Sequence, residues 1–60
     1  MSDKEYSRAE RRKDRRVREL RAVYTARGLD GDAASDVAIE LAIREVFGSY
    51  EIYLAEACRK

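Results

Sequence analysis

Three glycines and the absence of proline constrain most strongly what this 60-residue chain can fold into. Glycine occurs only at Gly28, Gly31 and Gly48, and the stretches between them consist mainly of residues that tolerate a helix. The pair Gly28-Leu29 is typical of a helix end, because glycine takes the left-handed position after the last turn and the leucine folds back onto that turn. Gly48-Ser49 offers a second end and a new N-cap. The sequence therefore predicts an all-α fold with breaks near residues 28 and 48.

The segments between these breaks predict two principal helices and a short third one, arranged as a small bundle or hairpin in a single domain. Ser2 and Glu5 match a capping box ahead of the first helix, and either Asp30 or Asp32 can cap the second. A continuous helix through Gly48 is the alternative to a separate third helix, at a cost of about 1 kcal/mol relative to alanine. The predicted helices span about 3–27, 33–47 and 50–58.

Charge divides the chain into a basic first part and an acidic second part. Residues 1–28 carry ten Lys/Arg and five Asp/Glu, a net charge of +5, whereas residues 29–60 carry three and seven, a net charge of −4. Such a division indicates a basic arm on an acidic body, or two helices that attract each other. Residues 1–16 contain few apolar side chains, so we expect a basic helical arm with almost nothing to bury and free to fray.

Arginines are concentrated between Arg8 and Arg18, where seven of eleven residues are Lys or Arg. On a helix, five of them form a stripe that could contact phosphates on a nucleic acid or a membrane surface. The interleaved acids Glu10, Asp14 and Glu19 favour the alternative, a solvated helix or one that docks onto the acidic second half. A small basic-arm adaptor for nucleic acid or an acidic protein is therefore one function hypothesis, with nucleic acid the less favoured partner. Its candidate binding residues are Arg8, Arg11, Arg12, Arg15 and Arg18.

Three carboxylates recur at every fourth position, at Asp32, Asp36 and Glu40, and so lie in a row on one helical face. Hard cations prefer oxygen ligands, so the row could supply part of a metal site. The simpler alternative is a solvated face whose acids favour the helix N-terminus, because one row cannot enclose an ion. We expect only weak divalent binding, by Mg²⁺, Ca²⁺ or an iron-like cation, and the sequence does not identify a cofactor beyond that.

The residue types that most catalytic sites need are scarce. The chain has no histidine and a single cysteine, Cys58. The side chains needed for a nucleophilic triad, or for a thiolate or imidazole metal site, are therefore almost absent. No catalytic residue is predicted, and we expect a non-enzymatic protein. Because no run of 18 apolar residues occurs and the first residues are polar, we expect no membrane span, no signal peptide and a cytoplasmic location.

Apolar side chains outnumber those that three short helices can enclose. On the helix predicted for 33–47 they cover an arc too broad for one partner surface, which is typical of a helix with several neighbours. We therefore expect a homo-oligomer or binding of partner helices. The apolar set comprises Val17, Leu20, Val23, Tyr24, Leu29, Val37, Ile39, Leu41, Ile43, Val46, Phe47, Ile52 and Leu54.

The stretch from Glu19 to Leu41, ELRAVYTARGLDGDAASDVAIEL, resembles a cytosolic helical region of the vacuolar iron transporter family. The resemblance continues weakly to about residue 54. The matching positions are Glu19, Leu20, Tyr24, Arg27, Gly28, Leu29, Ala34, Val37, Ala38 and Leu41.

In that family the region lies between two membrane spans and its Glu and Met residues bind iron. The resemblance therefore implies a metal-binding module at the cytosolic face of a membrane, with the transporter domain as its partner. The ligand positions match poorly, because arginines replace several upstream Glu residues. The leading function hypothesis is accordingly a non-catalytic helical interaction module with weak divalent-metal binding, and the basic-arm adaptor is the alternative. The candidate metal ligands are Glu19, Asp32, Asp36 and Glu40.

Overall fold

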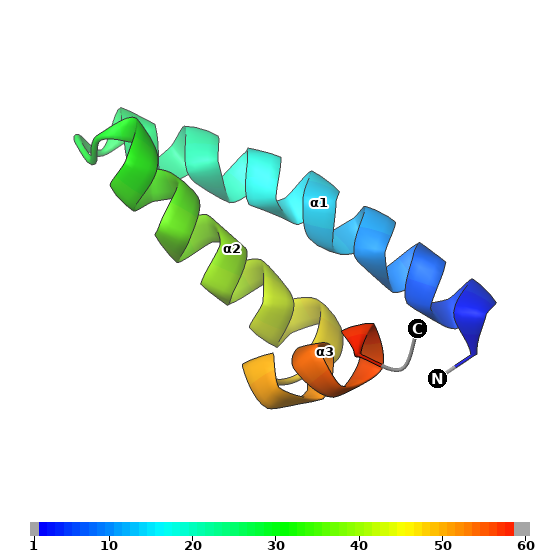
Figure 1. Ribbon diagram of the computed structural model, residues 1–60. Helices are drawn as coiled ribbons and strands as arrows, with labels where there is room; N and C mark the ends of the chain where they lie inside the picture. The colour runs from blue at the N-terminus through cyan, green and yellow to red at the C-terminus, as the bar shows by residue number, and fades with distance from the viewer. Residues whose placement is uncertain (1, 59–60) are drawn as a thin grey trace.

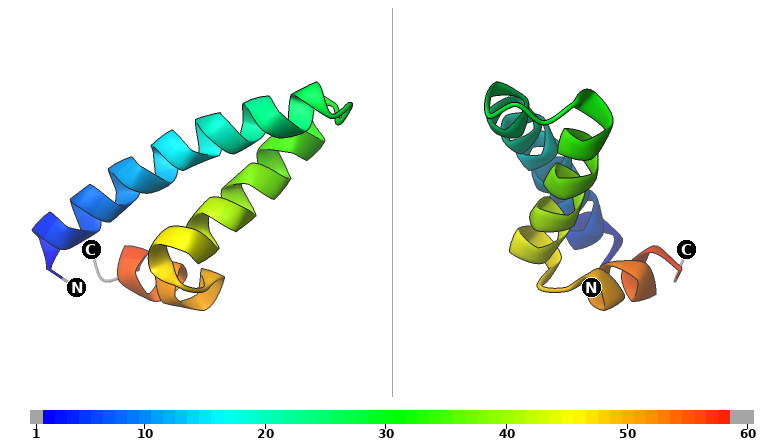
Figure 2. Two further views of the ribbon diagram at one scale, coloured as in Figure 1. Left: turned by 180° about the vertical axis from the view of Figure 1, so that it is seen from behind. Right: turned by 90° about the vertical axis from the view of Figure 1, so that its left-hand side faces the viewer.

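The computed structural model describes residues 2–58, which form three α-helices. Helices α1 and α2 lie side by side in opposite directions as a hairpin, and α3 lies across its open end, beside the first turns of α1 (Figures 1 and 2). The all-α prediction is confirmed, and residues 2–58 contain no strand. The helices are α1 (Asp3–Ala26), α2 (Gly31–Phe47) and α3 (Tyr50–Ala57).

All three helices begin at a side-chain cap. The side chains of Ser2, Asp30 and Ser49 each accept a hydrogen bond from the backbone N–H three residues ahead, at 3.2, 2.8 and 3.2 Å. Because Asp30 is the cap, α2 begins at Gly31, two residues earlier than predicted. The separation of α3 from α2 is confirmed by Gly48, whose φ of +95° lies in the left-handed region.

The turn after α1 has the hydrogen bonds of a Schellman motif. Gly28, with φ of +104°, donates from its N–H to the carbonyl of Thr25 at 3.1 Å. Leu29 donates to the carbonyl of Tyr24, also at 3.1 Å, and its side chain is half-buried. These two bonds satisfy carbonyls that the helix end would otherwise leave without a partner. The predicted stop at Gly28-Leu29 is confirmed.

Alanines form the centre of the contact between α1 and α2. Ala34, Ala38 and Ala42 stand one turn apart on α2 and have no exposed surface. Leu20 of α1 packs against Ala38 and Ala42, with Val17, Tyr24 and Leu41 around them. Side chains this small let the two helices approach closely, so a narrow seam holds the hairpin. None of the helices within residues 2–58 combines the length and the apolar character needed to cross a membrane.

The first turns of α1 bury more than the sequence indicated. Ala9 is 1% exposed, and the ring of Tyr6 lies 5.9 Å from that of Phe47. Phe47 in turn lies 5.0 Å, edge to face, from Tyr53 of α3. The expectation of an arm with almost nothing to bury is therefore wrong at these positions, because its partners come from the opposite end of the sequence. Packing against both α1 and α3 also accounts for part of the broad apolar arc of α2.

Candidate functional site

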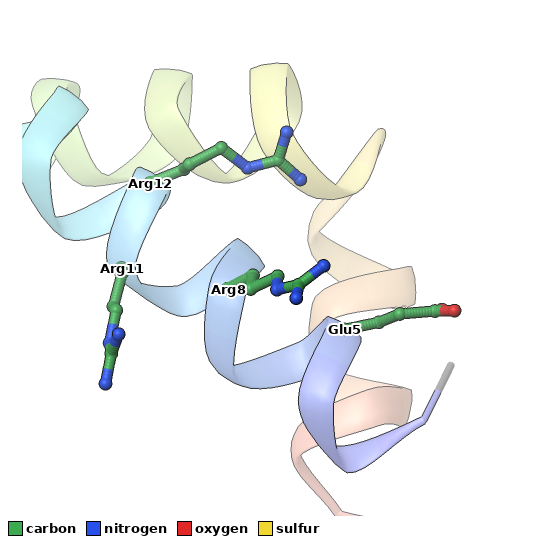
Figure 3. A pocket seen from close by; sticks show the side chains of 4 residues that line it. All are labelled: Glu5, Arg8, Arg11 and Arg12. Carbon is green, nitrogen blue, oxygen red and sulfur yellow. The ribbon is translucent and has the colours of Figure 1, made fainter.

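Five arginines occupy the side of α1 that is turned away from α2. Spacings of three and four residues place them on one side of the helix, while Ala9 and Leu20 lie buried on the other. All five are exposed, and they form what we call the arginine face: Arg8, Arg11, Arg12, Arg15 and Arg18. Figure 3 shows Arg8, Arg11 and Arg12 extending from α1, with α2 and α3 behind it. With Glu5, these three line an open hollow at the beginning of the arginine face.

The acids interleaved with the arginine face are paired with two other basic residues. Lys13 Nζ forms an ion pair with Glu10 and lies 3.3 Å from Asp14 Oδ1. Arg16 Nη1 lies 3.8 Å from Glu19 Oε2. Within residues 2–58, no residue of the arginine face forms an ion pair at 4.0 Å or less. The guanidinium groups of this face are therefore not held in ion pairs by the described residues.

Lys13 is turned inward, toward α3. Its ammonium donates a hydrogen bond to Tyr53 Oη at 3.5 Å and lies 5.0 Å from the centre of that ring. Burial lowers the pKa of Lys13, but the hydrogen bond and charge of Glu10, together with Tyr53, outweigh burial and raise the pKa overall. Glu10 also accepts a hydrogen bond from the Tyr6 hydroxyl, which with burial raises the pKa of Tyr6 to about 12. The cluster therefore keeps its protons, and Lys13 stays charged, at neutral pH.

Arg16 connects α1 with α2. Its Nε donates a hydrogen bond to Glu45 Oε2 at 2.9 Å, and the pKa of Arg16 is raised by that bond and by the carboxylate charge. The sequence alternative in which the basic helix docks onto the acidic second half is thus realised at this pair. Lys13 and Arg16 together orient α1 so that the arginine face points outward.

The four predicted metal ligands are distributed over α1 and α2. Asp32, Asp36 and Glu40 are exposed on α2, and Glu19 is exposed on α1 beside Arg16. Among residues 2–58, no group of three or more Asp, Glu, Cys or His is placed to hold a metal ion. Weak divalent binding through these carboxylates stays a prediction.

Sequence reasoning missed the structural roles of Lys13 and Tyr6. Both were counted with the basic, polar arm, although Tyr6, Ala9 and Lys13 share one face at spacings of three and four residues. That spacing, with Glu10 between Tyr6 and Lys13, was the available signal. Their partners, Phe47 and Tyr53, are some forty positions away and have no local signature.

Comparison with protein-family models, curated proteins and solved structures finds no match to this chain. The resemblance to the vacuolar iron transporter family stays a prediction. The residues that carry it lie at the end of α1, in the turn around Gly28 and along α2 to Leu41. They include Leu20 and Ala38, which pack in the seam, and Leu29, which closes the Schellman motif. These three residues therefore have structural roles in the hairpin.

Proposed function

We propose that the protein is a non-catalytic module that binds the phosphate backbone of nucleic acid on the arginine face. The observation that supports this most directly is the pairing of the interleaved acids. Glu10, Asp14 and Glu19 contact Lys13 or Arg16 rather than the arginine face. This pairing supports the proposal against the objection that these acids neutralise the arginine face directly.

The arginine face has the chemistry and shape for phosphates. Each guanidinium presents a planar set of donors that can bind a phosphate through two hydrogen bonds. From Arg8 to Arg18 the helix rises about 15 Å, so several phosphates of one strand can be contacted at once. Because α1 is already ordered within the hairpin, binding of phosphates costs little conformational entropy of the chain.

The surroundings of the arginine face favour nucleic acid over a lipid surface. A helix that lies in a membrane interface needs a free apolar side next to its basic side. In α1 the apolar residues Leu20 and Ala9 are already buried within the hairpin. No aromatic residue belongs to the arginine face, so base stacking is absent from the proposal. We therefore expect binding that depends on phosphate charge and is independent of base sequence.

The test is the salt dependence of binding to a fluorescent duplex DNA of mixed sequence, measured by anisotropy. With four or five phosphate contacts, the logarithm of the association constant should fall with the logarithm of salt with a slope of about −4. The variant Arg12→Gln/Arg15→Gln should reduce the magnitude of that slope by about two.

A matched control removes the same charge elsewhere. Arg21 and Arg44 are exposed and lie outside the arginine face, so Arg21→Gln/Arg44→Gln should retain the wild-type slope. Equal losses in both variants would show that net charge, rather than this face, determines binding. No binding at low salt would overturn the proposal, and an acidic protein would then be the partner to test.

A further inference from the structure

An apolar hollow of about 380 Å³ lies between α2 and α3, lined by Ile39 and Tyr50 together with two carboxylates. Ile39 is 42% exposed and Tyr50 is 50% exposed. Leu54, one turn beyond Tyr50 on α3, is 43% exposed. The α2 residues of the hollow lie on a different side of that helix from Ala38, which faces α1. About half of each of these three apolar side chains is therefore open to solvent.

The rim of the hollow is negatively charged. Asp36 and Glu40 line it, and Asp32 precedes them by one turn on the same face of α2. None of these three carboxylates forms an ion pair at 4.0 Å or less with another of residues 2–58. An apolar floor with an acidic rim suits a basic helix whose side chains have long aliphatic stems.

We propose that this hollow binds the arginine face of a second copy of the chain. The two surfaces are opposite in charge and similar in spacing. The row from Asp32 to Glu40 extends over about 12 Å with roughly one charge per turn. Arg8, Arg12 and Arg15 extend over about 10 Å at a similar spacing, with Arg11 beside them. Arginine stems would cover Ile39, and a guanidinium would stack on the ring of Tyr50.

One copy supplies its hollow and the other its arginine face, so each single contact joins two different surfaces. Each copy offers both a hollow and an arginine face, and a contact of this kind forms a chain of copies or a closed ring. The net charge of +1 means that copies do not repel each other strongly. This inference goes beyond the proposed function and competes with it, because a duplex and a second copy need the same arginines.

Sedimentation velocity over a range of protein concentrations tests the proposal. At about 50 mM salt the mean mass should rise with concentration, and at about 500 mM salt, where charges are screened, the protein should be monomeric. Two variants should each remain monomeric at low salt while keeping the wild-type circular dichroism. They are Arg12→Glu/Arg15→Glu, which alters the arginine face, and Asp36→Lys/Glu40→Lys, which alters the hollow.

An equimolar mixture of these two variants should associate, because one keeps the hollow and the other keeps the arginine face. Adding Ile39→Gln to the variant that keeps the hollow leaves its charge unchanged and should weaken the mixed complex about tenfold. A mixture that stays monomeric, or that is insensitive to Ile39→Gln, would overturn the proposal. So would a wild-type protein that is monomeric at every concentration.

The binding of duplex DNA and the contact with a second copy can be tested independently. Ile39→Gln alone should weaken self-association and leave affinity for duplex DNA unchanged at protein concentrations where the chain is monomeric. Loss of duplex binding without loss of self-association would contradict the function and leave the second-copy contact in place.

Discussion

The ammonium of Lys13 lies 5.0 Å from the centre of the Tyr53 ring and 3.5 Å from its hydroxyl oxygen, joining residues forty positions apart. This contact connects the first half of α1 to α3, which lies at the end of the hairpin away from its turn (Figure 1), where Tyr6 also packs against Phe47. With the Arg16–Glu45 pair, it adds polar contacts to the side of α1 that faces inward through the burial of Ala9 and Leu20. Lys13 therefore has a structural role, although its neighbours in sequence form the arginine face.

Replacing Lys13 with alanine should destabilise the fold by about 1–2 kcal/mol, because the variant loses the contact with Tyr53 and the ion pair with Glu10. The Lys13 side chain is 12% exposed, so solvent screens these interactions only partly. Urea unfolding followed by helical circular dichroism measures the change. Lys4→Ala, at an exposed position on the same helix, should change the free energy of unfolding by less than about 0.5 kcal/mol. Equal effects of the two substitutions would contradict a structural role for Lys13.

Stability should fall in alkaline solution, beginning near pH 10. The hydrogen bond to Glu10 raises the pKa of Tyr6 from 10.0 to about 12, and the pKa of Lys13 is raised from 10.5. For both groups the folded state holds its proton more tightly than the unfolded state, so their contribution is fully present below pH 10. It is lost as the pH rises toward and through 12.

Urea titrations at a series of pH values test this, with Tyr6→Phe as the matched variant, because it keeps the ring that packs on Phe47 and removes the hydroxyl. The variant should lose less stability than the wild type between pH 10 and 12. The ultraviolet absorbance of tyrosinate, compared between the two proteins, reports the titration of Tyr6 directly. Identical alkaline profiles would show that the Tyr6–Glu10 bond does not contribute.

Two glycines near the turn should respond to alanine in opposite ways. Gly28 has φ of +104°, where an alanine side chain is strained, so Gly28→Ala should destabilise by about 1 kcal/mol. Gly31 lies in the first turn of α2 with open space around its Cα, so Gly31→Ala should stabilise by roughly 0.5 kcal/mol by restricting the unfolded chain. Thermal unfolding of both variants measures the two signs. If both substitutions destabilised the protein, the positive φ at Gly28 would not be what distinguishes the two positions.

Local signals in the sequence account for the helices and their ends. The caps at Ser2 and Ser49 and the stop at Gly28-Leu29 rest on residues three to five positions apart, and each was predicted correctly. The start of α2 was placed two residues late, because Asp30 and Asp32 are equally suitable caps by sequence.

The candidate site could be predicted only in part. The helical spacing of the arginines predicted a stripe, and the structure shows all five side chains exposed. Which acids neutralise which bases was not predictable, because Glu10 can reach several basic residues at helical spacing. Glu10 pairs with Lys13, and Lys13 also contacts Tyr53 of α3, a tertiary contact that the local sequence does not reveal. For the same reason, the spacing of Tyr6, Ala9 and Lys13 on one face could not identify the residues that cover Ala9.

The close packing of α1 against α2 depends on small side chains in the alanine seam. Ala38 has no exposed surface and packs beside Ala42 and Leu20, so a larger side chain there has no free space. Ala38→Leu should therefore destabilise the hairpin by about 1–3 kcal/mol, even though leucine suits a helix nearly as well as alanine. Ala55→Leu makes the same change at an exposed position of α3 and should lie within about 0.5 kcal/mol of the wild type. Urea unfolding compares the two; if Ala38→Leu were as stable as Ala55→Leu, the helices could separate at no cost, and the alanine seam would not be what holds the arginine face in place.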